Sequence, residues 1–436
     1  MKKSLWTDSL NLPKFDSLNK DAKTDVLIIG GGLCGILCAY YLYQAGVDHI
    51  LVEGNEIASG ITKNTTAKIT SQHGLIYKKI IDIYGTEKAQ MYLEANQKAL
   101  KEYENLCQII DCNFERKDAY TYSLTNRTKI EDEVCAVSKL GFDCDYVERL
   151  ELPFKTKGAI RFKNQAQFHP LKFVTEIVER LNIYENTFVR EYTPDGVITN
   201  GGRIRAEKIV VTTHFPFINK HGSYFLKLYQ HRSYVSAFEN APILNGMYVD
   251  EDKKGMSFRD YGNLILVGGS GHRTGKKSRA WEGLEEFIKK NYPEARLKYR
   301  WAAQDCMSLD GIPYIGRYSK NTPNMYVATG FNKWGVTSSM VAAMILTDML
   351  QGRENGFADV FSPQRSMLKS QLLINGIEST INLLTPTTKR CPHLGCALKW
   401  NKAEHTWDCP CHGSRFQKDG KIIDNPATGD ANFKDI

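Results

Sequence analysis

Two Cys and two His residues near the end of the chain stand at a spacing that constrains how this region can fold. They are Cys391, His393, Cys409 and His412, in the order C-x-H, fifteen further residues, then C-x-x-H. Thiolates and imidazoles are ligands for iron and for zinc. Four such side chains can meet only if two separate loops bring them together. The sequence therefore predicts a small C-terminal domain built around a metal centre.

Two kinds of centre use this ligand set. In a [2Fe-2S] centre of this type, two thiolates hold one iron and two imidazoles hold the other, which raises the reduction potential above that of an all-thiolate cluster. Zinc is the alternative, but zinc motifs usually leave two to four residues between the first two ligands. Only Pro392 separates Cys391 from His393. The spacing favours the iron-sulfur centre, which carries one electron at a time.

The residues around the ligands resemble the two cluster-binding loops of Rieske proteins. The matching stretches are Cys-Pro-His-Leu-Gly-Cys at 391–396 and Cys-Pro-Cys-His-Gly-Ser at 409–414. The resemblance implies that Cys391 and Cys409 hold the inner iron of a [2Fe-2S] cluster. It implies that His393 and His412 hold the outer iron.

Other residues of these loops carry further implications of the resemblance. Cys396 and Cys411 match the pair that forms a disulfide in the Rieske proteins of cytochrome bc complexes, with two packed free thiols as the alternative. Ser414 is expected to donate a hydrogen bond to a cluster sulfide, which stabilises the reduced state. Phe416 stands where a Tyr is usual in that family. We therefore expect a potential below the top of the Rieske range.

A second cofactor motif lies near the start of the chain. An apolar run at 25–29 leads into the pattern G-x-G-x-x-G at Gly30, Gly32 and Gly35, and an amphipathic stretch follows. Gly30 suits a tight turn, Gly32 a close approach of a pyrophosphate, and Gly35 close packing of helix on strand. A second expected strand ends in Glu53, eighteen residues past Gly35, where a carboxylate can bind ribose hydroxyls. The pattern predicts a dinucleotide site; a structural Gly-rich turn is the alternative.

The choice of FAD over NAD rests on a resemblance to the D-amino-acid oxidase superfamily, which includes glycine oxidase and sarcosine oxidase. Residues 58–67 are similar to that family's loop from the pyrophosphate to the isoalloxazine ring, and residues 310–316 and 325–337 resemble its closing signature. Together the matches span most of residues 22–352. Besides Gly30, Gly32, Gly35 and Glu53, the residues implied to bind FAD are Thr62, Lys63, Thr66, Ala67, Gly330, Gly335, Val336 and Thr337.

The closing stretch has a physical interpretation of its own. Residues 325–329 have the composition of a strand, 330–335 that of a loop, and 336–350 that of a helix with apolar residues near one face. The first N–H groups of such a helix are unpaired and would stabilise negative charge on the pyrimidine side of a flavin. Lys333 and Trp334 either line that site or belong to a surface loop.

The stretches between the FAD-related motifs have the patterns of buried helices and strands, and one Gly-rich stretch predicts the end of a strand. Helical spacing occurs at 87–110 and 171–181, a buried strand at 208–214, and strand-like composition at 233–238, 247–249 and 263–267. The Gly-rich stretch 268–272 is expected to break the last strand; as a second nucleotide site it lacks a following amphipathic helix. A helix-like piece at 367–374 is expected to end at Asn375 and Gly376.

These patterns predict a Rossmann-type α/β FAD-binding domain interleaved with a mainly antiparallel β substrate domain, followed by a small all-β Rieske domain. We expect an N-terminal extension at 1–24, the oxidoreductase region at 25–352, a linker and docking segment at 353–388, and the Rieske domain at 389–436. Within the oxidoreductase region, the FAD-binding parts are expected at about 25–85, 185–215 and 300–352, and the substrate parts at about 86–184 and 216–299.

Composition limits the partners and the location. The net charge of +8 is spread over 57 basic and 49 acidic residues without a block of five like charges, so no nucleic-acid partner is expected and at most a mild preference for an acidic redox partner. The N-terminus lacks the apolar stretch of a signal peptide, and no membrane span is expected. Most of the eleven cysteines are scattered, which fits a reducing compartment. We predict a cytoplasmic protein.

The two cofactors together predict an enzyme that oxidises a small amine or amino acid. In this hypothesis a hydride leaves a carbon that bears an amine and reaches the flavin, and electrons then pass singly to the cluster. His393 and His412, at an exposed cluster edge, would pass them to an unidentified acceptor. A dehydrogenase is favoured over an oxidase, because an oxidase can return both electrons to oxygen and needs no cluster.

The catalytic residues are not identified by the sequence. Lys68, His73, Tyr261 and His272 are candidates to meet the substrate, and the carboxylate-binding Arg of amino-acid oxidases has no match. A Rieske oxygenase would need two His and a carboxylate for a mononuclear iron, and the other histidines are scattered. An NAD(P)H-dependent reductase would need a second dinucleotide fold. A non-catalytic redox sensor or electron-transfer protein remains the alternative function.

Overall fold

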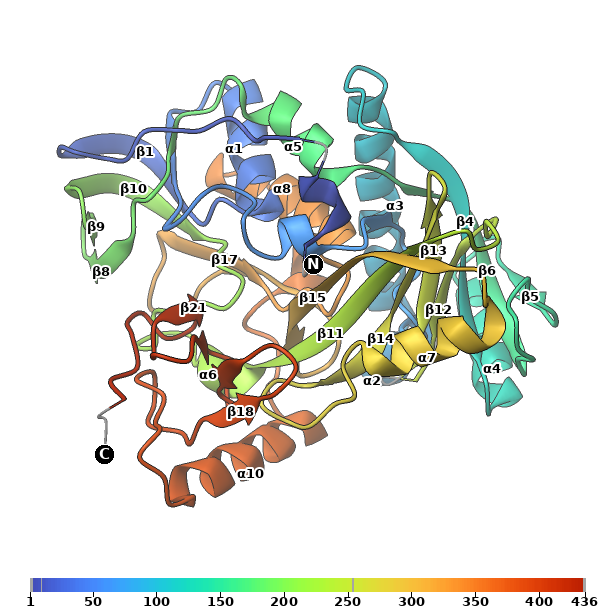
Figure 1. Ribbon diagram of the computed structural model, residues 1–436. Coiled ribbons are helices and arrows are strands. Elements are labelled where there is room, and N and C mark those ends of the chain that lie inside the picture. Colours follow the sequence, from blue (N-terminus) through green and yellow to red (C-terminus); the bar gives the residue numbers. More distant parts are fainter. Residues whose placement is uncertain (1–2, 9, 253–254, 434–436) are drawn as a thin grey trace.

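The computed structural model describes residues 3–8, 10–252 and 255–433 (Figure 1). The α-helices are α1 (Leu33–Gln44), α2 (Tyr77–Tyr84), α3 (Thr86–Cys107), α4 (Arg127–Lys139), α5 (Pro170–Val178), α6 (Tyr224–Lys227), α7 (Glu282–Asn291), α8 (Gly335–Leu350), α9 (Ala358–Phe361) and α10 (Ser370–Leu384). Two 3-10 helices span Leu5–Thr7 and Thr62–Asn64. In these described ranges, no helix has both the length and the apolar composition to cross a membrane.

The strands form three sheets. Their bounds are β1 (Ala22–Ile29), β2 (His49–Val52), β3 (Lys68–Ile69), β4 (Glu115–Ser123), β5 (Asp145–Val147), β6 (Gly158–Gln167), β7 (Ile183–Tyr184), β8 (Val189–Thr193), β9 (Gly196–Thr199), β10 (Arg203–Val211), β11 (Leu228–Glu239), β12 (Met247–Asp250), β13 (Ser257–Tyr261), β14 (Leu264–Arg273), β15 (Arg296–Ser308), β16 (Tyr314–Arg317), β17 (Met325–Thr329), β18 (Lys399–Asn401), β19 (Thr406–Asp408), β20 (Arg415–Phe416) and β21 (Ile422–Asp424).

The first sheet is parallel at its centre. Strands β17, β10, β1, β2 and β7 lie side by side in parallel, with antiparallel β16 at one edge and the β8–β9 hairpin paired to β10. Ile29 of β1 is opposite both Val52 of β2 and Val211 of β10, so three strands end together. A ligand crevice is expected at the carboxyl ends of such strands. The predicted strands at 25–29, 49–52 and 325–329 are confirmed.

Two helices form the inner layer against this sheet. Helices α1 and α8 pack against each other, with α3 beside α8 and α5 beside α1. Nearly every residue of α8 from Val336 to Thr347 is buried. A helix that is apolar on all sides is stable only when it is covered on all sides, which explains its central position.

The second sheet is mainly antiparallel, as predicted. Its order is β15-β11-β14-β13-β12-β4-β6-β3, with β5 paired to β6, and β12 and β4 form a parallel pair. The expected break at 268–272 is wrong, because β14 continues to Arg273. Gly268 and Gly269 pair with β11, and a Cβ at Gly269 would lie 3.0 Å from Leu284 of α7. Gly269 thus permits close packing of α7 on the sheet, and neither glycine forms a turn.

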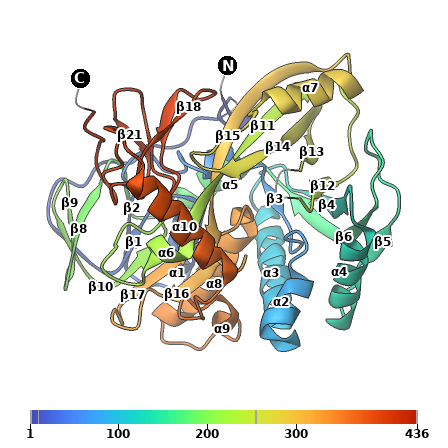
Figure 2. The same ribbon diagram turned by 90° about the horizontal axis from the view of Figure 1, so that it is seen from below.

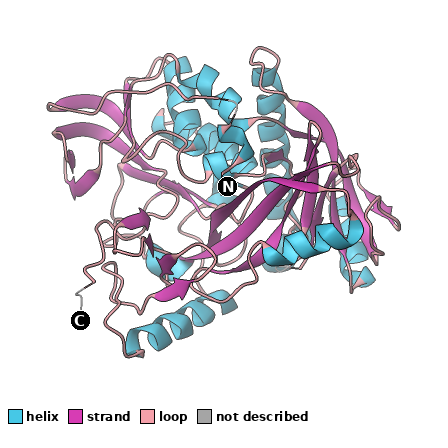
Figure 3. Cartoon of the chain, in the orientation of Figure 1, coloured by secondary structure: helices cyan, strands magenta, loops and turns pink. Residues whose placement is uncertain are grey.

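The C-terminal region holds a small four-stranded sheet, β18 to β21, and the helix α10 (Figures 1 and 2). Figure 3 shows that most of this region is loop. The expectation that Asn375 and Gly376 end a helix is wrong, since α10 runs through both. The Asn375 side chain is buried, accepts a hydrogen bond from Arg273 at 2.8 Å and donates one to the Leu226 carbonyl at 3.3 Å. These tertiary contacts outweigh the weak helix propensity of the pair.

Candidate functional site

The three motif glycines meet different surroundings at the end of β1. Gly30 has a φ of +113°, and a Cβ there would lie 2.9 Å from the Thr212 carbonyl. A Cβ at Gly35 would lie 2.0 Å from the Gly30 carbonyl oxygen, so only glycine allows this helix to contact the turn. A Cβ at Gly32 would meet only the Thr62 hydroxyl, at 3.6 Å. Gly32 therefore faces open space in which a phosphate can approach the backbone.

Glu53 stands directly after β2, at the same edge of the sheet. Its carboxylate accepts hydrogen bonds from the amides of Gly31, at 2.7 Å, and Asn55, at 2.9 Å. Burial raises the pKa of this carboxyl group above its usual range. The side chain is thus held against the glycine turn.

A cavity of about 700 Å³ opens at this edge and continues to the N-terminus of α8. That volume is in the range of small-molecule sites. Of the residues predicted to bind FAD, those lining the cavity are Gly30, Gly32, Glu53, Thr62, Thr66, Gly330, Gly335 and Val336. Those outside its lining are Gly35, Lys63, Ala67 and Thr337. Thr337 instead fixes the residue that follows β3, because its hydroxyl donates to the Thr70 carbonyl at 2.9 Å and accepts from the Thr70 amide at 3.0 Å.

The cavity wall fits a dinucleotide. It offers the open glycine at Gly32, a carboxylate at Glu53 and the unpaired amides at the start of α8. Four residues of the cavity wall have a positive φ although they are not glycines: Ala58, His214, Asn332 and Lys333. Such strained backbone costs free energy and persists only where the surroundings impose it, as at ligand sites.

Lys68, Asp305 and Lys333 are among the charged side chains that line the cavity. Burial, with Arg259 nearby, lowers the pKa of Lys68 to about 7. Burial raises the pKa of Asp305 to about 6, although Lys333 and Arg232 act in the opposite direction. Lys333 and Trp334 thus belong to the cavity wall, which decides between the two interpretations that the sequence left open.

The other substrate candidates lie away from the cavity lining. His73 is buried, bonds to the Tyr92 hydroxyl at 2.6 Å and stacks on Trp334 with ring centres 4.9 Å apart. Tyr261 bonds to Asn113, and His272 stacks on Tyr234. Of the four candidates named from sequence, only Lys68 reaches the cavity.

In the C-terminal region, the two ligand loops have the same backbone turn. The Gly395 amide donates to the Cys391 carbonyl and the Gly413 amide to the Cys409 carbonyl, both at 2.9 Å. Both glycines have a positive φ, +76° and +87°. The repeated turn places Cys391 and Cys409 at equivalent positions of two facing loops.

The two imidazoles present matching nitrogen atoms. Nδ1 of His393 and Nδ1 of His412 are buried without a hydrogen-bond partner, and the ring centres are 5.0 Å apart. Nε2 of His393 lies 3.1 Å from Oδ1 of Asn219, and the backbone of Phe225 bonds to the His412 ring. Burial lowers the pKa of His393 to about 4 and that of His412 to about 3, so both rings are neutral. A neutral ring with one bonded and one free nitrogen is a metal ligand's usual state.

The two thiols also fit a metal centre. The Cys409 side chain lowers the pKa of Cys391 to about 7, while Cys391 raises that of Cys409, as expected when two buried thiols share one proton. A bound cation would remove this conflict by deprotonating both. The donor set of two thiols and two free Nδ1 atoms therefore fits a [2Fe-2S] cluster.

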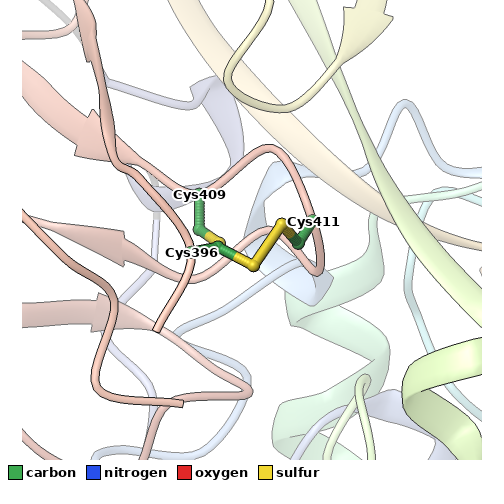
Figure 4. Close-up of side chains that lie close together, drawn as sticks. All are labelled: Cys396, Cys409 and Cys411. Atoms are coloured by element: carbon green, nitrogen blue, oxygen red, sulfur yellow. A yellow bond between two sulfur atoms is a disulfide. The ribbon is translucent and has the colours of Figure 1, made fainter. Parts of the chain in front are cut away.

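Cys396 and Cys411 form the predicted disulfide, with Cα atoms 6.7 Å apart. Figure 4 shows the Cys409 side chain beside this bond. The sulfur atoms of Cys396, Cys409 and Cys411 lie within 4.8 Å of one another, but two of them are consumed by the disulfide. The bond joins the two ligand loops directly. Ser414 is fully buried, and its hydroxyl accepts from the Ala427 amide at 3.0 Å.

Three side chains of the second sheet hold the second ligand loop by its backbone carbonyls. Arg273 donates to Pro410 at 2.9 Å and to Cys411 at 3.0 Å. Gln230 donates to His412 at 3.0 Å, and Gln304 donates to Gly413 at 2.9 Å. Four consecutive carbonyls, 410 to 413, are thus bound by β11, β14 and β15. We call Gln230, Arg273 and Gln304 the carbonyl clamp.

A buried ion-pair network fastens the same domain nearby. Arg232 of β11 forms a two-pronged pair with Glu404, which also accepts from Arg415 at 2.9 Å. Arg415 further pairs with Asp408 at 3.1 Å and Asp424 at 3.0 Å. Arg232 and Arg415 lower the pKa of Glu404 to about 2 despite its burial.

The imidazole edge of the cluster site faces the FAD-binding half. The ring of Phe215 contacts both imidazoles, with centres 6.5 Å from His393 and 6.1 Å from His412. His412 is only 3% exposed, so the prediction of an exposed edge is wrong for this ligand. The residues after β10 and around α6 cover the edge, which no pattern in the sequence indicated.

The C-terminal domain also forms part of the cavity wall. The stretch Ile422 to Asn425, with Ala427 and Thr428, lines the same cavity as the glycine turn. The Asn425 side chain donates to the carbonyls of Thr213, at 2.6 Å, and Phe215, at 2.9 Å. His214, between these two residues, lines the cavity as well. One short segment thus connects the cavity with the imidazole edge.

The sequence did not identify His214, Gln230, Arg273, Gln304 or Asp305. Their only signal is a polar side chain within or at the end of an apolar strand, and that signal does not say what the side chain meets.

Comparison with known proteins assigns both halves of the chain. Residues 25–349 match the family described as FAD dependent oxidoreductase, and residues 373–434 match the Rieske [2Fe-2S] domain. A Rieske 2Fe-2S iron-sulfur protein of Bacillus subtilis, YhfW, is 36% identical over 97% of this chain and 95% of its own length. The gamma-glutamylputrescine oxidoreductase of Escherichia coli is 22% identical over 80% of this chain and 88% of its own length.

Among solved structures, the L-proline dehydrogenase of P. horikoshii superposes with a TM-score of 0.67 at 15% identity, over 79% of this chain and 98% of the other. The protein is therefore a flavoprotein oxidoreductase with an iron-sulfur domain. It belongs to the FAD dependent oxidoreductase family and carries a C-terminal Rieske [2Fe-2S] domain. It binds FAD and a [2Fe-2S] cluster, which confirms the predicted cofactors and fold class.

Proposed function

We propose that this protein is a dehydrogenase that oxidises a C–N bond of a small amine or amino acid. Electrons then pass singly to the Rieske domain and on to an external acceptor. Bound FAD supplies a two-electron acceptor, and the cluster supplies a one-electron carrier. One observation carries the proposal: residues 422–425, 427 and 428 of the Rieske domain form part of the wall of the cavity that the FAD motifs line.

The residues that would hold the two groups follow from the site. We propose Gly30, Gly32, Glu53 and the start of α8 for FAD, with Gly35 as a packing residue. Thr62, Thr66 and Gly330 line the same cavity, whereas Lys63, Ala67 and Thr337 lie outside its lining. For the cluster we propose Cys391, His393, Cys409 and His412. For the domain limits we propose those expected from the sequence, with the docking segment at 353–388.

The carbonyl clamp and the ion-pair network support a fixed docking of the Rieske domain. A buried hydrogen bond contributes about 1 kcal/mol, and one from a charged group about 1.5–3 kcal/mol. Several of them act together here, so the clamp favours one orientation with the imidazole edge toward the cavity. That edge is then where electrons arrive. They must leave through another part of the domain.

The substrate class rests on the cavity and on the relatives. The relatives named above act on an amine, gamma-glutamylputrescine, and on an amino acid, L-proline. Among the described residues, Lys68 and Lys333 are the Lys or Arg side chains that line the cavity, which Asp305 also lines, and Lys68 is the less exposed of the two. We propose that Lys68 binds a carboxylate where the substrate has one, and that Asp305 orients the amine. A reducing compartment suits the nine cysteines outside the disulfide, and a cytoplasmic location remains a prediction.

Anaerobic titration with candidate substrates tests the proposal. Small primary and secondary amines and L-amino acids are added to purified protein while flavin absorbance and the electron paramagnetic resonance of the cluster are recorded. We expect one substrate class to bleach the flavin and produce the reduced-cluster signal. A flavin that is reduced while the cluster stays oxidised would contradict the relay. Absence of flavin reduction by every candidate would favour the redox-sensor alternative.

A further inference from the structure

Helix α10 exposes apolar side chains and buries polar ones, which is the reverse of an ordinary surface helix. Its large aliphatic residues Leu373, Ile377, Ile381 and Leu384 recur at spacings of three and four and are 51% to 76% exposed. The buried residues of α10 are Asn375 and Asn382. Surface helices normally bury the apolar stripe and expose the polar one. Here the polar stripe packs on the protein and the apolar stripe faces outward.

The apolar stripe extends onto neighbouring segments. Further exposed aliphatic side chains are Leu226 at 39%, Leu368 at 86%, Ile374 at 49%, Leu383 at 45% and Leu394 at 41%. We call these residues, with the four of the stripe, the α10 surface. In Figure 1, α10 lies along the lower rim of the molecule, and in Figure 2 it crosses the side turned toward the viewer. The two views agree that the helix lies at the outside.

The α10 surface is joined to the first cluster loop. Leu394 lies between the ligand His393 and Gly395, and a Cβ at Gly395 would lie 3.9 Å from the Leu383 side chain. The Ala397 amide donates to the Asn382 carbonyl at 2.9 Å, and Arg390 donates to the carbonyls of Leu383, at 3.0 Å, and Gly395, at 2.9 Å. Whatever covers α10 therefore lies close to a cluster ligand.

The composition of the α10 surface differs from that of a protein interface. All of its members are Leu or Ile. The centres of protein interfaces are enriched in Tyr, Trp, Phe, Met and Arg, and Leu is under-represented among their strongest contributors. Helices that lie in a membrane interface bury a face of Leu, Phe or Trp and carry Lys and Arg around it.

The charges around the α10 surface are complementary to an anionic lipid layer. Between residues 362 and 403 the only acidic residue is Glu378, and it pairs with Lys276 at 2.6 Å. The same stretch contains the basic residues Lys369, Lys389, Arg390, Lys399 and Lys402, while a sixth, Arg365, is buried in a pair with Asp310. Lys369 stands just before α10, and Lys389 and Arg390 follow it. Basic residues near a bilayer are attracted by anionic headgroups.

We infer that α10 docks the protein on the surface of an anionic lipid bilayer, with the helix lying in the interface and the first cluster loop beside it. This position would deliver electrons to a lipid-dissolved quinone, a consequence that rests on the proposed function. Oxidation of an amine to an imine releases two electrons and two protons. Reduction of a quinone to a quinol takes up the same number, and the cluster carries the electrons one at a time.

Sedimentation with vesicles tests the docking without any turnover. The probe is vesicles of equal parts phosphatidylglycerol and phosphatidylcholine, compared with phosphatidylcholine alone. We expect the holoprotein to bind the anionic vesicles more tightly, and added salt to weaken that binding. The variant Leu373→Gln/Ile377→Gln/Ile381→Gln is expected to bind at least about tenfold more weakly, because three aliphatic side chains no longer leave water.

A matched variant controls for surface hydrophobicity in general. Ile109 and Ile243 are 81% and 55% exposed and lie away from α10, so Ile109→Gln/Ile243→Gln should bind vesicles like the unchanged protein. Flavin and cluster absorbance must be the same in both variants. No sedimentation with anionic vesicles, or equal sedimentation of both variants, would overturn the inference. A dimer in light scattering that the α10 variant dissolves would overturn it too, because a second copy would then cover the helix.

The relay and the docking fail in distinguishable ways. Substrate reduces the cluster in solution if the relay is right, whether or not vesicles bind. A quinone held in the vesicles should be reduced at least about tenfold faster by the unchanged protein than by the α10 variant, while a water-soluble acceptor is reduced equally by both. Equal rates with the vesicle-bound quinone would overturn the consequence for the acceptor.

Discussion

The side-chain amide of Gln230 donates a hydrogen bond to the backbone carbonyl of His412 at 3.0 Å. Strand β11, whose Gln230 lines the cavity, thereby touches the backbone of a proposed cluster ligand. The same amide nitrogen bonds to the Asn425 carbonyl at 3.0 Å, in the segment that lines the cavity. The cavity lined by the FAD motifs and the proposed cluster site therefore share a wall, and a change in one should be measurable in the other.

The glycine turn should distinguish packing from cofactor binding. Gly35→Ala would place a methyl group 2.0 Å from the Gly30 carbonyl oxygen and should lower the yield of folded protein. Gly32→Ala has room in the protein but projects toward the cofactor, so we expect a normal fold with FAD affinity lowered by about tenfold or more. Circular dichroism and flavin content measure the two effects. Equal FAD content in Gly32→Ala and the unchanged protein would contradict the assignment.

Removing Arg273 should loosen the docking and change the cluster. Arg273→Gln removes a buried charged donor to Pro410 and Cys411, with an expected cost of about 2–4 kcal/mol. Calorimetry should show the Rieske domain unfolding in a separate, earlier transition. Loss of a positive charge near Cys409 should also lower the midpoint potential of the cluster. Arg279→Gln, at an exposed pair with Glu286, is the matched control and should leave both quantities unchanged.

Breaking the buried pair of Arg232 and Glu404 should lower the stability of the protein strongly, whereas replacing both residues by apolar ones should lower it less. Glu404→Gln leaves Arg232 buried without its full partner and should destabilise the protein by about 3–5 kcal/mol. Arg232→Met/Glu404→Leu removes both charges, so urea unfolding should recover part of that loss. The recovery is limited, since Arg415 also uses Glu404. The explanation would be contradicted if the double variant lost more free energy of unfolding than the variants with a single change at Arg232 and at Glu404 lose together.

Loss of a proposed cluster ligand should remove the cluster without affecting the binding of FAD. Cys409→Ser is expected to abolish bound iron and acid-labile sulfide while FAD content stays the same, because no FAD motif is altered. Metal analysis and flavin absorbance measure the two. Cys135→Ser, at an exposed cysteine, is the control and should retain the full cluster. Zinc in place of iron in the unchanged protein would contradict the assignment.

Lys68 should give substrate binding a pH dependence near neutrality. Its pKa of about 7 lies below the ordinary Lys value, so the side chain is charged below pH 7 and increasingly neutral above it. A carboxylate-bearing substrate should therefore bind more tightly below pH 7, with KM rising as the pH increases through 7. Lys68→Met should raise KM at pH 6 by about tenfold and remove that rise, whereas amines without a carboxylate should show neither effect. Steady-state kinetics from pH 6 to 8 provide the measurement.

The sequence by itself determined what depends on short-range pattern. The turn at Gly30, the carboxylate at the end of β2 and each pair of proposed cluster ligands lie within a few residues of the motif that identifies them. A turn, a cap or a ligand loop is a local structure, so the spacing of a few residues is enough to indicate a fold element or a kind of cofactor site. The dinucleotide site and the metal centre were predictable for this reason, whereas FAD, the fold class and the disulfide followed from the resemblance to known families.

Only the tertiary structure decided how the two sites meet. Gln230, Arg273 and Gln304 lie on three different strands, and the carbonyls they bind lie more than a hundred residues later in the chain. Asn375 does not end α10, because Arg273 and Leu226 bind its side chain. A polar side chain in an apolar strand has the same local pattern whether it meets water or a ligand loop. Its partner is set by the packing of distant segments, which periodicity and composition do not encode.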